Sequence, residues 1–518
     1  MAFSRSVATV GFFTLLSRLL GFVRDLVTAN LLGVGPVADA YIVAQRLPNM
    51  FRALFAEGAV DSTFVPIYTR KKRQEAPAEV AVFVNHIFTI LVLVLLPLTI
   101  LAILLMPWVI RLIAPGFADD PQRFNLAVTY GSITFGYLLL VSVTALQGGL
   151  LNANRHFAPF AIAPVILNAI MIAGLLYAKW EGLEAGLIGS WALIAGGVAQ
   201  CAWLYVYCRR QGLSLGFAWP RWTSDVRRFF KLVGPGVIGI SADQIHLLVS
   251  TILASTLPSG AIAALYYADR VNQLPFGVIG GAIATTLLPV LTHHIAARET
   301  KETTHHFSRA IEIALLVSLP VGLVLLLAAE PLIRILFQHG AFDAENTRST
   351  AQALASYALA IPAYMMVRIL NMRFFAHEDT KTPVLVTFIA VLANGGAAWL
   401  LKPSLGHVGI ALAFTFALWV NAVCLSFLLW QRGQFRVDRT LKRHLPRLAG
   451  AAAIMGGVLM VSVRLNESLS EVLVLPDFIY DLVVLGIRLG VSGMAYLAVL
   501  DMLGVARLSD IKKLLKRA

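Results

Sequence analysis

Long apolar stretches separated by short polar connections dominate the chain. A window of about 19 residues, the length of helix that crosses a bilayer, identifies these stretches. They lie at residues 6–32, 37–66, 80–106, 126–151, 158–178, 184–208, 230–256, 261–292, 309–337, 349–372, 383–401, 406–430, 446–464 and 481–505. The pattern predicts an all-α polytopic membrane protein with about 14 transmembrane helices.

Composition agrees with this prediction and excludes several classes of protein. The chain is 58% hydrophobic and only 14% charged, whereas soluble domains are roughly 25% charged. Its three cysteines, Cys201, Cys208 and Cys424, lie in or beside apolar stretches, so they indicate neither a disulfide framework nor a metal site. The formal net charge of +14 is spread over loops between apolar stretches. A nucleic-acid-binding protein would gather it on one solvated face.

The distribution of Lys and Arg predicts the orientation in the membrane. If the loops alternate between the two sides, 28 of the 42 Lys and Arg fall on one side, seven on the other and seven within the spans. Cytoplasmic loops are enriched in these residues, so both termini are expected in the cytoplasm. No A-x-A-like cleavage pattern follows the first apolar stretch, and we expect that stretch to remain as the first helix.

The chain also matches itself at a nearly constant offset. The matched positions are Ala44-Gln45-Arg46 with Ala268-Asp269-Arg270, Pro159 with Pro383, and Gly186 with Gly409. The offset predicts two homologous six-helix lobes at residues 1–215 and 216–435, followed by two appended helices and a basic tail at residues 436–518. Parallel repeats of this kind occur in transporters, with the substrate path between the lobes. A duplicated scaffold without transport is the alternative.

Several charged residues fall inside the predicted spans. They are Arg18, Arg24 and Asp25 in the first span, Asp39, Arg46, Arg52 and Glu57 in the second, and Asp269 and Arg270 in the eighth. Each charge at the bilayer centre costs roughly 2.5–3.5 kcal/mol on insertion scales, so such a group indicates a wet or ligand-filled interior. Snorkelling at helix ends and internal ion pairs, such as Arg18 with Asp25, are the alternatives.

Helix geometry places some of these charges on common stripes. At 100° per residue, Asp39, Arg46 and Glu57 fall within about 20° of one line, and Arg18 and Asp25 are similarly aligned. Arg24 and Arg52 lie off the stripes. Helix irregularities at Gly21 and Pro48, which lie between, could turn them inward.

Arginine outnumbers the acidic residues in these spans, which favours an anionic guest. Guanidinium is always charged and bonds phosphate oxygens in bidentate fashion, so a diphosphate on a lipid headgroup is the natural ligand. Arg368 and Arg488 are each alone on their spans, and the sequence assigns them no role.

At these residues the chain resembles the MurJ/MviN family of lipid II flippases. The resemblance rests on Ser17-Arg18-Leu19-Leu20-Gly21-Phe22-Val23-Arg24-Asp25, Ala38-Asp39-Ala40, Leu47-Pro48-Asn49, Arg52, Phe55-Ala56-Glu57-Gly58-Ala59, Phe64-Val65-Pro66, Ala114-Pro115-Gly116-Phe117, Tyr266-Tyr267-Ala268-Asp269-Arg270 and Lys381-Thr382-Pro383. It implies membership of the multidrug/oligosaccharidyl-lipid/polysaccharide exporter superfamily. It also implies a groove for the lipid tail along the last two helices, and export of lipid II across the bacterial inner membrane for peptidoglycan and cell-wall synthesis.

The resemblance also implies which residues bind substrate. The family's essential cavity positions correspond to Arg18, Arg24, Asp25, Asp39, Arg52, Glu57 and Arg270, and Arg46 keeps a charge at a position that is Lys in some relatives. Gln273 stands where some relatives have an acidic residue. Some relatives also have a sodium site, for which Asp243 and Asn394 are the nearest polar candidates here, without a second carboxylate.

Other motifs do not support an enzyme. No G-x-x-x-x-G-K-[ST] phosphate loop is present, and residues 234–239 match G-x-G-x-x-G while opening an apolar span, so no ATP site is expected. We expect no metal or cofactor, and read His293-His294 and His305-His306 as loop residues. The membrane potential or an ion gradient would supply the energy, and a monomer surrounded by membrane lipids is expected.

Two further functions stay open at this point. A drug or cation antiporter, or a flippase for another lipid-linked oligosaccharide, could share the superfamily, although an antiporter of cations would favour an acidic interior. A membrane enzyme or scaffold for cell-wall synthesis would need a clustered acid, base or nucleophile in a loop, and the sequence shows none.

Overall fold

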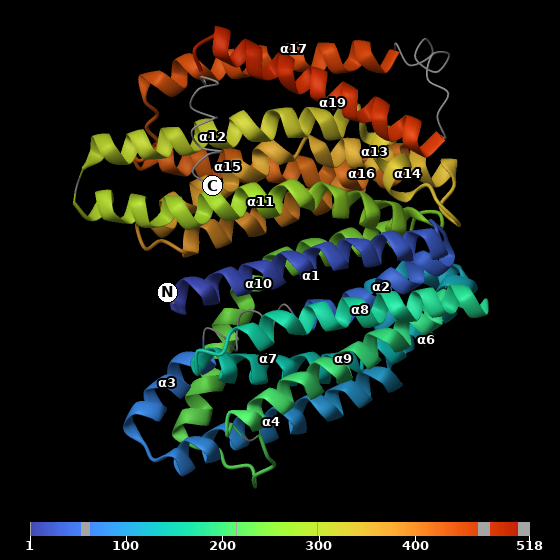
Figure 1. Ribbon diagram of the computed structural model, residues 1–518, viewed down its shortest axis with the longest axis vertical. Coiled ribbons are helices and arrows are strands. Elements are labelled where there is room, and N and C mark those ends of the chain that lie inside the picture. The colour runs from blue at the N-terminus through green and yellow to red at the C-terminus, as the bar shows by residue number, and fades with distance from the viewer. Residues whose placement is uncertain (1, 53–62, 214, 298, 465–476, 506–518) are drawn as a thin grey trace. The chain divides into compact units, whose positions relative to one another are not determined.

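The computed structural model describes the backbone of residues 2–52, 63–213, 215–297, 299–464 and 477–505, and the regular elements in these ranges are helices (Figure 1). The helices are α1 Ala2–Leu32, α2 Pro36–Arg52, α3 Val65–Gln74, α4 Pro77–Leu104, α5 Met106–Ile113, α6 Pro121–Thr134, α7 Tyr137–Ala153, α8 Ala158–Glu181, α9 Ala185–Arg210, α10 Ser224–Ser255, α11 Ala261–Ala296, α12 Thr300–Leu327, α13 Ala329–Phe337, α14 Ala344–Ala358, α15 Ile361–Phe375, α16 Lys381–Gln431, α17 Arg439–Arg464 and α19 Asp477–Met502. A short 3₁₀ helix, Pro115–Asp119, precedes α6.

The predicted all-α membrane fold is confirmed. Among the described residues, nine helical stretches are both long and apolar enough to cross a bilayer. The predicted eleventh and twelfth spans are joined in α16, which bends at Gly406, where φ is 56°. The stretch predicted at 309–337 consists of two helices. Helix α12 begins earlier than predicted, at Thr300, and the amphipathic α13 follows it. In the predicted second span, α2 ends at Arg52, and residues 53–62 lie outside the described residues.

The helices repeat along the chain at the offset found in the sequence. Helices α4, α5, α6, α7 and α8 recur as α12, α13, α14, α15 and α16, each beginning at nearly the same spacing from its counterpart. In the described backbone the two non-glycine residues with positive φ, Arg155 and Glu378, are separated by this spacing as well. The conformation costs an L-residue roughly 1–2 kcal/mol, so its recurrence at one place in both halves indicates a shared local fold. The pseudo-symmetric lobes are thus present as repeated helices.

Contacts divide the chain into two compact units whose limits differ from those of the repeats. Unit 1 comprises residues 1–263 and 339–342, and unit 2 comprises residues 264–338 and 343–518. Ala341 belongs to unit 1 because its N–H donates to the carbonyl of Asn30 at 2.8 Å. The three-part division at residues 215 and 435 stays a prediction.

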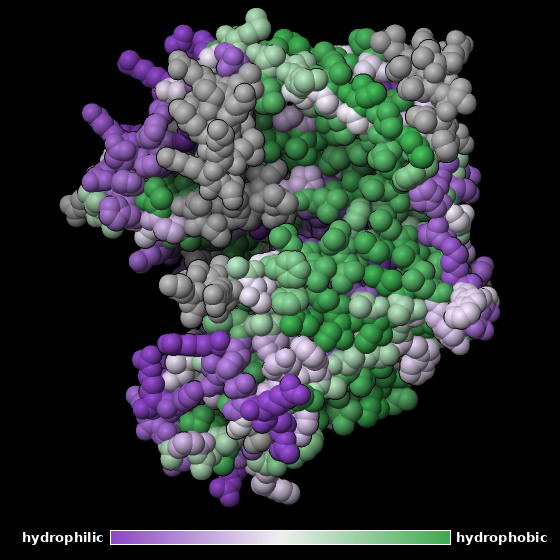
Figure 2. Space-filling view, in the orientation of Figure 1, coloured by the Kyte–Doolittle hydropathy of each residue, from purple (hydrophilic) through white to green (hydrophobic). Residues whose placement is uncertain are grey.

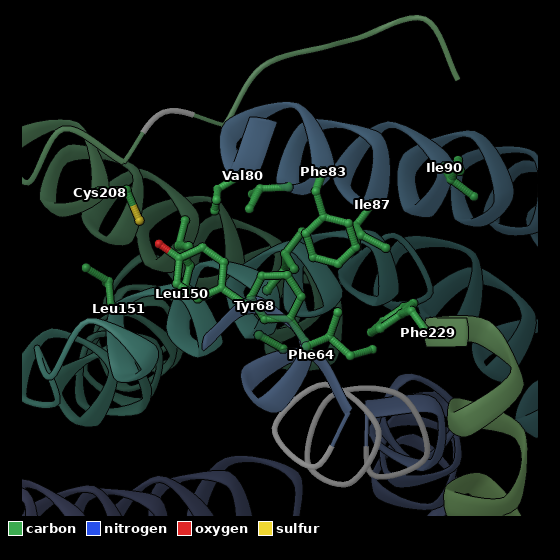
Figure 3. Close-up of a cluster of buried hydrophobic side chains, with 14 of the residues drawn as sticks. Phe64, Tyr68, Val80, Phe83, Ile87, Ile90, Leu150, Leu151, Cys208 and Phe229 are labelled. Atoms are coloured by element: carbon green, nitrogen blue, oxygen red, sulfur yellow. The ribbon is translucent and has the colours of Figure 1, made fainter. Parts of the chain in front are cut away.

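Unit 1 contains the helices of the first lobe together with α10. Within it α1 packs against α8, α8 against α9 and α2 against α6. Phe64 is wholly buried, with its ring 5.7 Å from Tyr68, 6.2 Å from Phe83 and 6.5 Å from Phe229 (Figure 3). Aromatic pairs at these separations stabilise by about 0.5–1.5 kcal/mol beyond their buried area. They join α3, α4 and the beginning of α10.

Unit 2 packs its two last described helices onto α12. Helix α17 lies against both α12 and α19, and the hydroxyl of Tyr496 in α19 donates to the carbonyl of Leu316 in α12 at 2.9 Å. Large apolar side chains on these helices remain exposed, including Ile454 and Met494. Figure 2 shows apolar side chains over wide areas of the surface, with hydrophilic side chains gathered at their edges. This distribution is typical of helices surrounded by lipid.

Asp379 ties the two ends of α16 together. Its carboxylate accepts hydrogen bonds from the N–H of Thr382 at 2.9 Å, from the Thr382 hydroxyl at 2.6 Å and from Arg432 at 2.7 Å. Burial alone would raise the pKa of Asp379, but the hydrogen bonds from Thr382 and the charge of Arg432 hold that pKa well below its usual value. The charged form therefore contributes stability above the pKa of an unfolded aspartate, about 3.9.

This contribution is expected to disappear in acid. At pH 7 the Asp379→Asn variant should unfold at a lower temperature than the wild type, because charge-assisted hydrogen bonds contribute about 1.5–3 kcal/mol. The difference should stay constant down to about pH 5 and narrow as the pH falls below 4, where an unfolded aspartate binds a proton. Thermal unfolding of both proteins at pH 7 and pH 3 measures it. An equal difference at the two pH values would contradict the assignment.

Candidate substrate-binding site

Arg24 lies at the centre of a hydrogen-bonded group on α1 and α8. Its Nε and one terminal nitrogen donate to Asp25 Oδ1 at 3.1 and 2.8 Å, and the other terminal nitrogen donates to Asn168 Oδ1 at 3.1 Å. Asn168 Nδ2 in turn donates to the carbonyl of Ser17 at 3.2 Å. The guanidinium is half-buried and Asp25 is buried. Asp25 and Asn168 together therefore orient the Arg24 guanidinium.

This arrangement differs from the ion pair considered in the sequence analysis. Asp25 bonds Arg24, whereas Arg18 is exposed. Neighbouring positions on a helix differ by 100°, but the arginine side chain is long enough to reach back to the carboxylate beside it. Helix α1 is continuous through Gly21, so no break is needed to turn Arg24 toward α8. Asn168 was not identified from the sequence, because the residue pattern of one apolar helix does not show which helix packs against it.

Asp39 is wholly buried and caps the beginning of α11. Oδ2 accepts from the N–H of Gly260 at 2.7 Å, and Oδ1 accepts from the N–H of Ala263 at 2.8 Å. The first N–H groups of a helix have no intrahelical partners and carry partial positive charge, so a carboxylate there is stabilising. Gly260 has φ 94°, and a Cβ there would meet Val34 at 2.7 Å. Asp39 thus anchors α2 to this turn, and its predicted contact with substrate stays a prediction.

Arg123, on α6, contacts the same turn and Asp39. One terminal nitrogen lies 3.7 Å from Asp39 Oδ2 and donates to the carbonyl of Leu257 at 3.2 Å, while Nε donates to Asp120 at 2.7 Å. Its guanidinium stacks on Phe117, 5.0 Å from the ring centre. Burial alone would raise the pKa of Asp120, but the hydrogen bonds from Arg123 lower it.

Sequence reasoning missed this role of Arg123. Asp120 and Pro121 form a recognisable helix start, with the Asp120 carboxylate accepting from the N–H groups of Gln122 and Arg123. That signal places Arg123 in the first turn of α6. The helix-start signal does not show that Arg123 bonds the carbonyl of Leu257, which is far along the chain. Only the tertiary structure shows this contact.

The remaining charged residues of α2 are only partly described. Arg46 is half-buried and donates a hydrogen bond to the hydroxyl of Thr251 in α10. The common stripe of Asp39 and Arg46 thus faces the α10–α11 hairpin. Arg52 is the last residue of α2 and its side chain lies outside the described part, as do Glu57 and the side chain of Asp243.

Arg270 lies on α11 in unit 2 and is half-buried. It donates to the Tyr266 hydroxyl at 3.0 Å and stacks on that ring, 4.7 Å from its centre. Gln273 donates to Asp269 at 2.5 Å, so the amide at this position engages the neighbouring carboxylate. Arg368 stacks on Tyr364 in the same i−4 arrangement, at 5.7 Å. Stacking on a tyrosine ring fixes the orientation of the guanidinium group. A guanidinium held in one orientation is suited to binding an anion.

The geometry of the described residues supports binding of a charged ligand. The side chains brought together in unit 1 are guanidinium, carboxylate, amide and hydroxyl groups held by one another. In the described part of the chain, no group of three or more His, Cys, Asp or Glu could hold a metal ion. The expectation that the four histidines lie in a loop is wrong, because His293 and His294 form part of the last turn of α11 and His305 and His306 lie in α12. His294 bonds Glu299 at 2.6 Å. That the charged residues of α1, α2 and α11 bind one substrate stays a prediction.

Comparison with known proteins decides the family. The family model described as "Lipid II flippase MurJ" matches residues 28–477. The chain belongs to the MurJ lipid II flippase family. It is 43% identical to a probable lipid II flippase MurJ of Rhizobium meliloti, over 89% of this chain and 87% of the relative. It is 38% identical to a probable lipid II flippase MurJ of Rhizobium tropici, over 100% of this chain and 97% of the relative. The family consists of transporters, so the enzyme alternative is excluded.

Solved structures show the same fold at lower identity. A lipid II flippase MurJ in an inward closed conformation matches with a TM-score of 0.78 and 23% identity, over 95% of this chain and 98% of that one. An inward-facing multidrug transporter of the MATE family matches with a TM-score of 0.67 and 14% identity, over 81% and 94%. These matches confirm the predicted superfamily fold.

Asn168 provides a mild test of how Arg24 is positioned. The Asn168→Ala variant should accumulate normally and transport the family's substrate about 2–10-fold more slowly, because a single hydrogen bond contributes about 0.5–1.5 kcal/mol. The readout is the dose of protein needed to support growth of cells depleted of their own flippase. The exposed Asn125 on α6 gives the matched control, Asn125→Ala, which should behave as wild type. Equal behaviour of the two variants would remove Asn168 from the site.

Proposed function

We propose that this chain moves lipid II from the cytoplasmic to the periplasmic leaflet of the bacterial inner membrane, with both of its own termini in the cytoplasm. Membership of the MurJ family carries the proposal: two relatives named as lipid II flippases are 38 and 43% identical over most of the chain. The excess of Lys and Arg on one set of loops supports the orientation.

The diphosphate of the substrate would be held by arginines. Arg24 and Arg270 are the best-supported members, because each is half-buried on a membrane helix and held in place by side chains around it. Arg24 bonds Asp25 and Asn168, and Arg270 bonds Tyr266. Arg18, Arg46 and Arg52 would add charge. Guanidinium forks match phosphate oxygens and remain charged at every physiological pH, which an ammonium group does less well. Asp25 would keep Arg24 oriented between transport cycles.

Transport would proceed by alternating access. The arginines capture the diphosphate from the inner leaflet, the undecaprenyl tail remains in lipid along α17 and α19, and the two repeated lobes rock to open outward. Moving one charge across the membrane potential is worth about 2.3 kcal/mol per 100 mV, so an inside-negative potential would favour return of the emptied cationic site to the inward-facing state.

A drug or cation antiporter is the weaker candidate. The match to MATE transporters shows a shared fold at 14% identity and carries no information about the guest. Cationic guests favour carboxylates in the binding site. Here Asp25 is bonded to Arg24, and Asp39 caps a helix, so neither is available to an incoming cation.

The experiment measures how much lipid II reaches the periplasmic face of the inner membrane. Cells depleted of their own flippase receive this chain, and lipid II exposed at the periplasmic face is labelled or cleaved by an enzyme that cannot enter the cytoplasm. We expect labelled lipid II to return to the level of undepleted cells and to fall when the potential is collapsed. Growth without labelled lipid II, or no restoration of either, would contradict the proposal.

A further inference from the structure

A cleft of about 540 Å³ lies between α3, α4 and the beginning of α10 in unit 1. Small-molecule sites have volumes of roughly 300–1,000 Å³, so the cleft can hold a metabolite. The residues that matter are Lys71, Glu75, Glu79, Phe83, His86 and Asp225. None of them belongs to the charged group proposed for lipid II.

The lining is acidic within a strongly basic part of the chain. Three carboxylates, those of Glu75, Glu79 and Asp225, line the cleft together with one ammonium group. Beside the lining, Arg70 donates to Asp225 Oδ1 at 3.4 Å, so three carboxylates face two cations. Lys71 is buried and donates to Glu75 and to Asp225, each at 2.7 Å. The lysine therefore uses part of the acceptor capacity of two carboxylates. Glu79 is exposed to the cleft and receives no side-chain hydrogen bond from the described residues.

His86 supplies an independent sign of a ligand. Its side chain lines the cleft, is only 6% exposed and takes no hydrogen bond from any described residue. Buried polar side chains nearly always have a partner, and this ring faces the cleft. Glu79 and His86 are two helical turns apart on α4, which places them on one face of the helix. An imidazole nitrogen and a carboxylate thus face the same space.

The chemistry of the lining selects the class of ligand. An anion would meet three carboxylates. A compact metal ion is disfavoured because no three of the described His, Cys, Asp and Glu groups could surround one. Phe83 adds an apolar wall between the polar groups. An elongated cation with several N–H donors joined by methylene groups fits carboxylates, imidazole and apolar wall together.

We propose that this cleft binds an aliphatic polyamine of the spermidine type. Its ammonium groups bond Glu79, the Glu75 oxygen that Lys71 does not use, and the remaining lone pairs of Asp225, whose two oxygens already accept from Arg70 and Lys71. His86 accepts one N–H, and the methylene groups lie along Phe83. The ligand joins α4 to the first turn of α10, where Asp225 lies. Binding to the folded protein alone raises its unfolding temperature.

Thermal unfolding of the purified full-length protein in detergent tests the proposal, with spermidine as the probe at constant ionic strength. The wild type should show a saturable rise in unfolding temperature. Half-saturation should move to at least about tenfold higher spermidine in Glu79→Gln and in His86→Gln, as expected for loss of a charge-assisted hydrogen bond. The exposed Glu345 at the start of α14 provides the matched control, Glu345→Gln, which should respond as wild type.

Three results would overturn it. The first is an equal spermidine response in the wild type and both cleft variants, and the second is no saturable response at millimolar spermidine. The third is an equal response to Mg²⁺, which would show general charge screening. Because the readout is unfolding temperature, failure here leaves the lipid II proposal untouched, and failure of lipid II transport leaves this one untouched.

Discussion

Replacing Arg24, Arg52 or Arg270 by alanine should each abolish lipid II export while folded protein remains in the membrane. Truncating one partner of a buried hydrogen-bonded charge pair costs about 2–5 kcal/mol, so a diphosphate that loses one guanidinium should be captured at least about 30-fold less well. Lipid II exposed at the outer face of flippase-depleted cells measures the loss. Conservative lysine variants should retain part of the activity, because they keep the charge and lose the bidentate fork.

The control is Arg348→Ala, an exposed arginine on α14. It should export lipid II normally at the same protein level. Full activity of all three alanine variants would defeat the assignment of these arginines to the substrate. Loss of activity accompanied by loss of membrane protein would indicate a structural role, which thermal unfolding of the purified variants identifies.

Replacing Asp39 by alanine should destabilise the protein strongly. The change leaves the N–H groups of Gly260 and Ala263 without their acceptor and takes from buried Arg123 a carboxylate 3.7 Å away. Removing one partner from a buried charged group costs about 3–5 kcal/mol. We expect a large fall in the unfolding temperature of Asp39→Ala, and little recovery in Asp39→Asn, because an amide offers only one acceptor oxygen to two N–H groups.

Asp343 provides a matched comparison. It also caps a helix, accepting from the N–H of Asn346 at 2.8 Å, but it is exposed. Its alanine variant should cost about 1 kcal/mol, the usual value for an N-cap. Arg123→Ala should cost less in the Asp39→Ala background than in the wild type, because the two residues share one network. Equal stability losses for Asp39→Ala and Asp343→Ala would refute the anchor.

The helices and their repeat could be read from the sequence because both depend on local pattern. A membrane helix needs an uninterrupted apolar stretch whatever it packs against, and a duplicated fold keeps its spacing, as α5 and α13 do. The split of the ninth predicted span was not predicted. Helix α12 ends at Leu327, and the short α13 that follows is amphipathic, with Glu330 and Arg334 among apolar residues.

The partners of the charged residues could not be read in the same way. The helical wheel separates Arg24 from Asp25 by 100°, yet the flexible arginine bonds the carboxylate next to it. Asp39 bonds backbone N–H groups that are distant in the chain, and a backbone group leaves no trace in a residue pattern. Arg123 likewise donates to a distant backbone group, the carbonyl of Leu257. The sequence thus identifies which charges are unusual, and tertiary structure decides whether each anchors a helix or remains available to a ligand.

Binding of lipid II to the purified protein tests the role of the arginines most directly. The wild type should bind lipid II more tightly than undecaprenyl phosphate, which carries a single phosphate, and Arg24→Ala and Arg270→Ala should reduce this preference at least about tenfold. Equal affinity for the two lipids, unchanged in both variants, would contradict a diphosphate held by guanidinium groups.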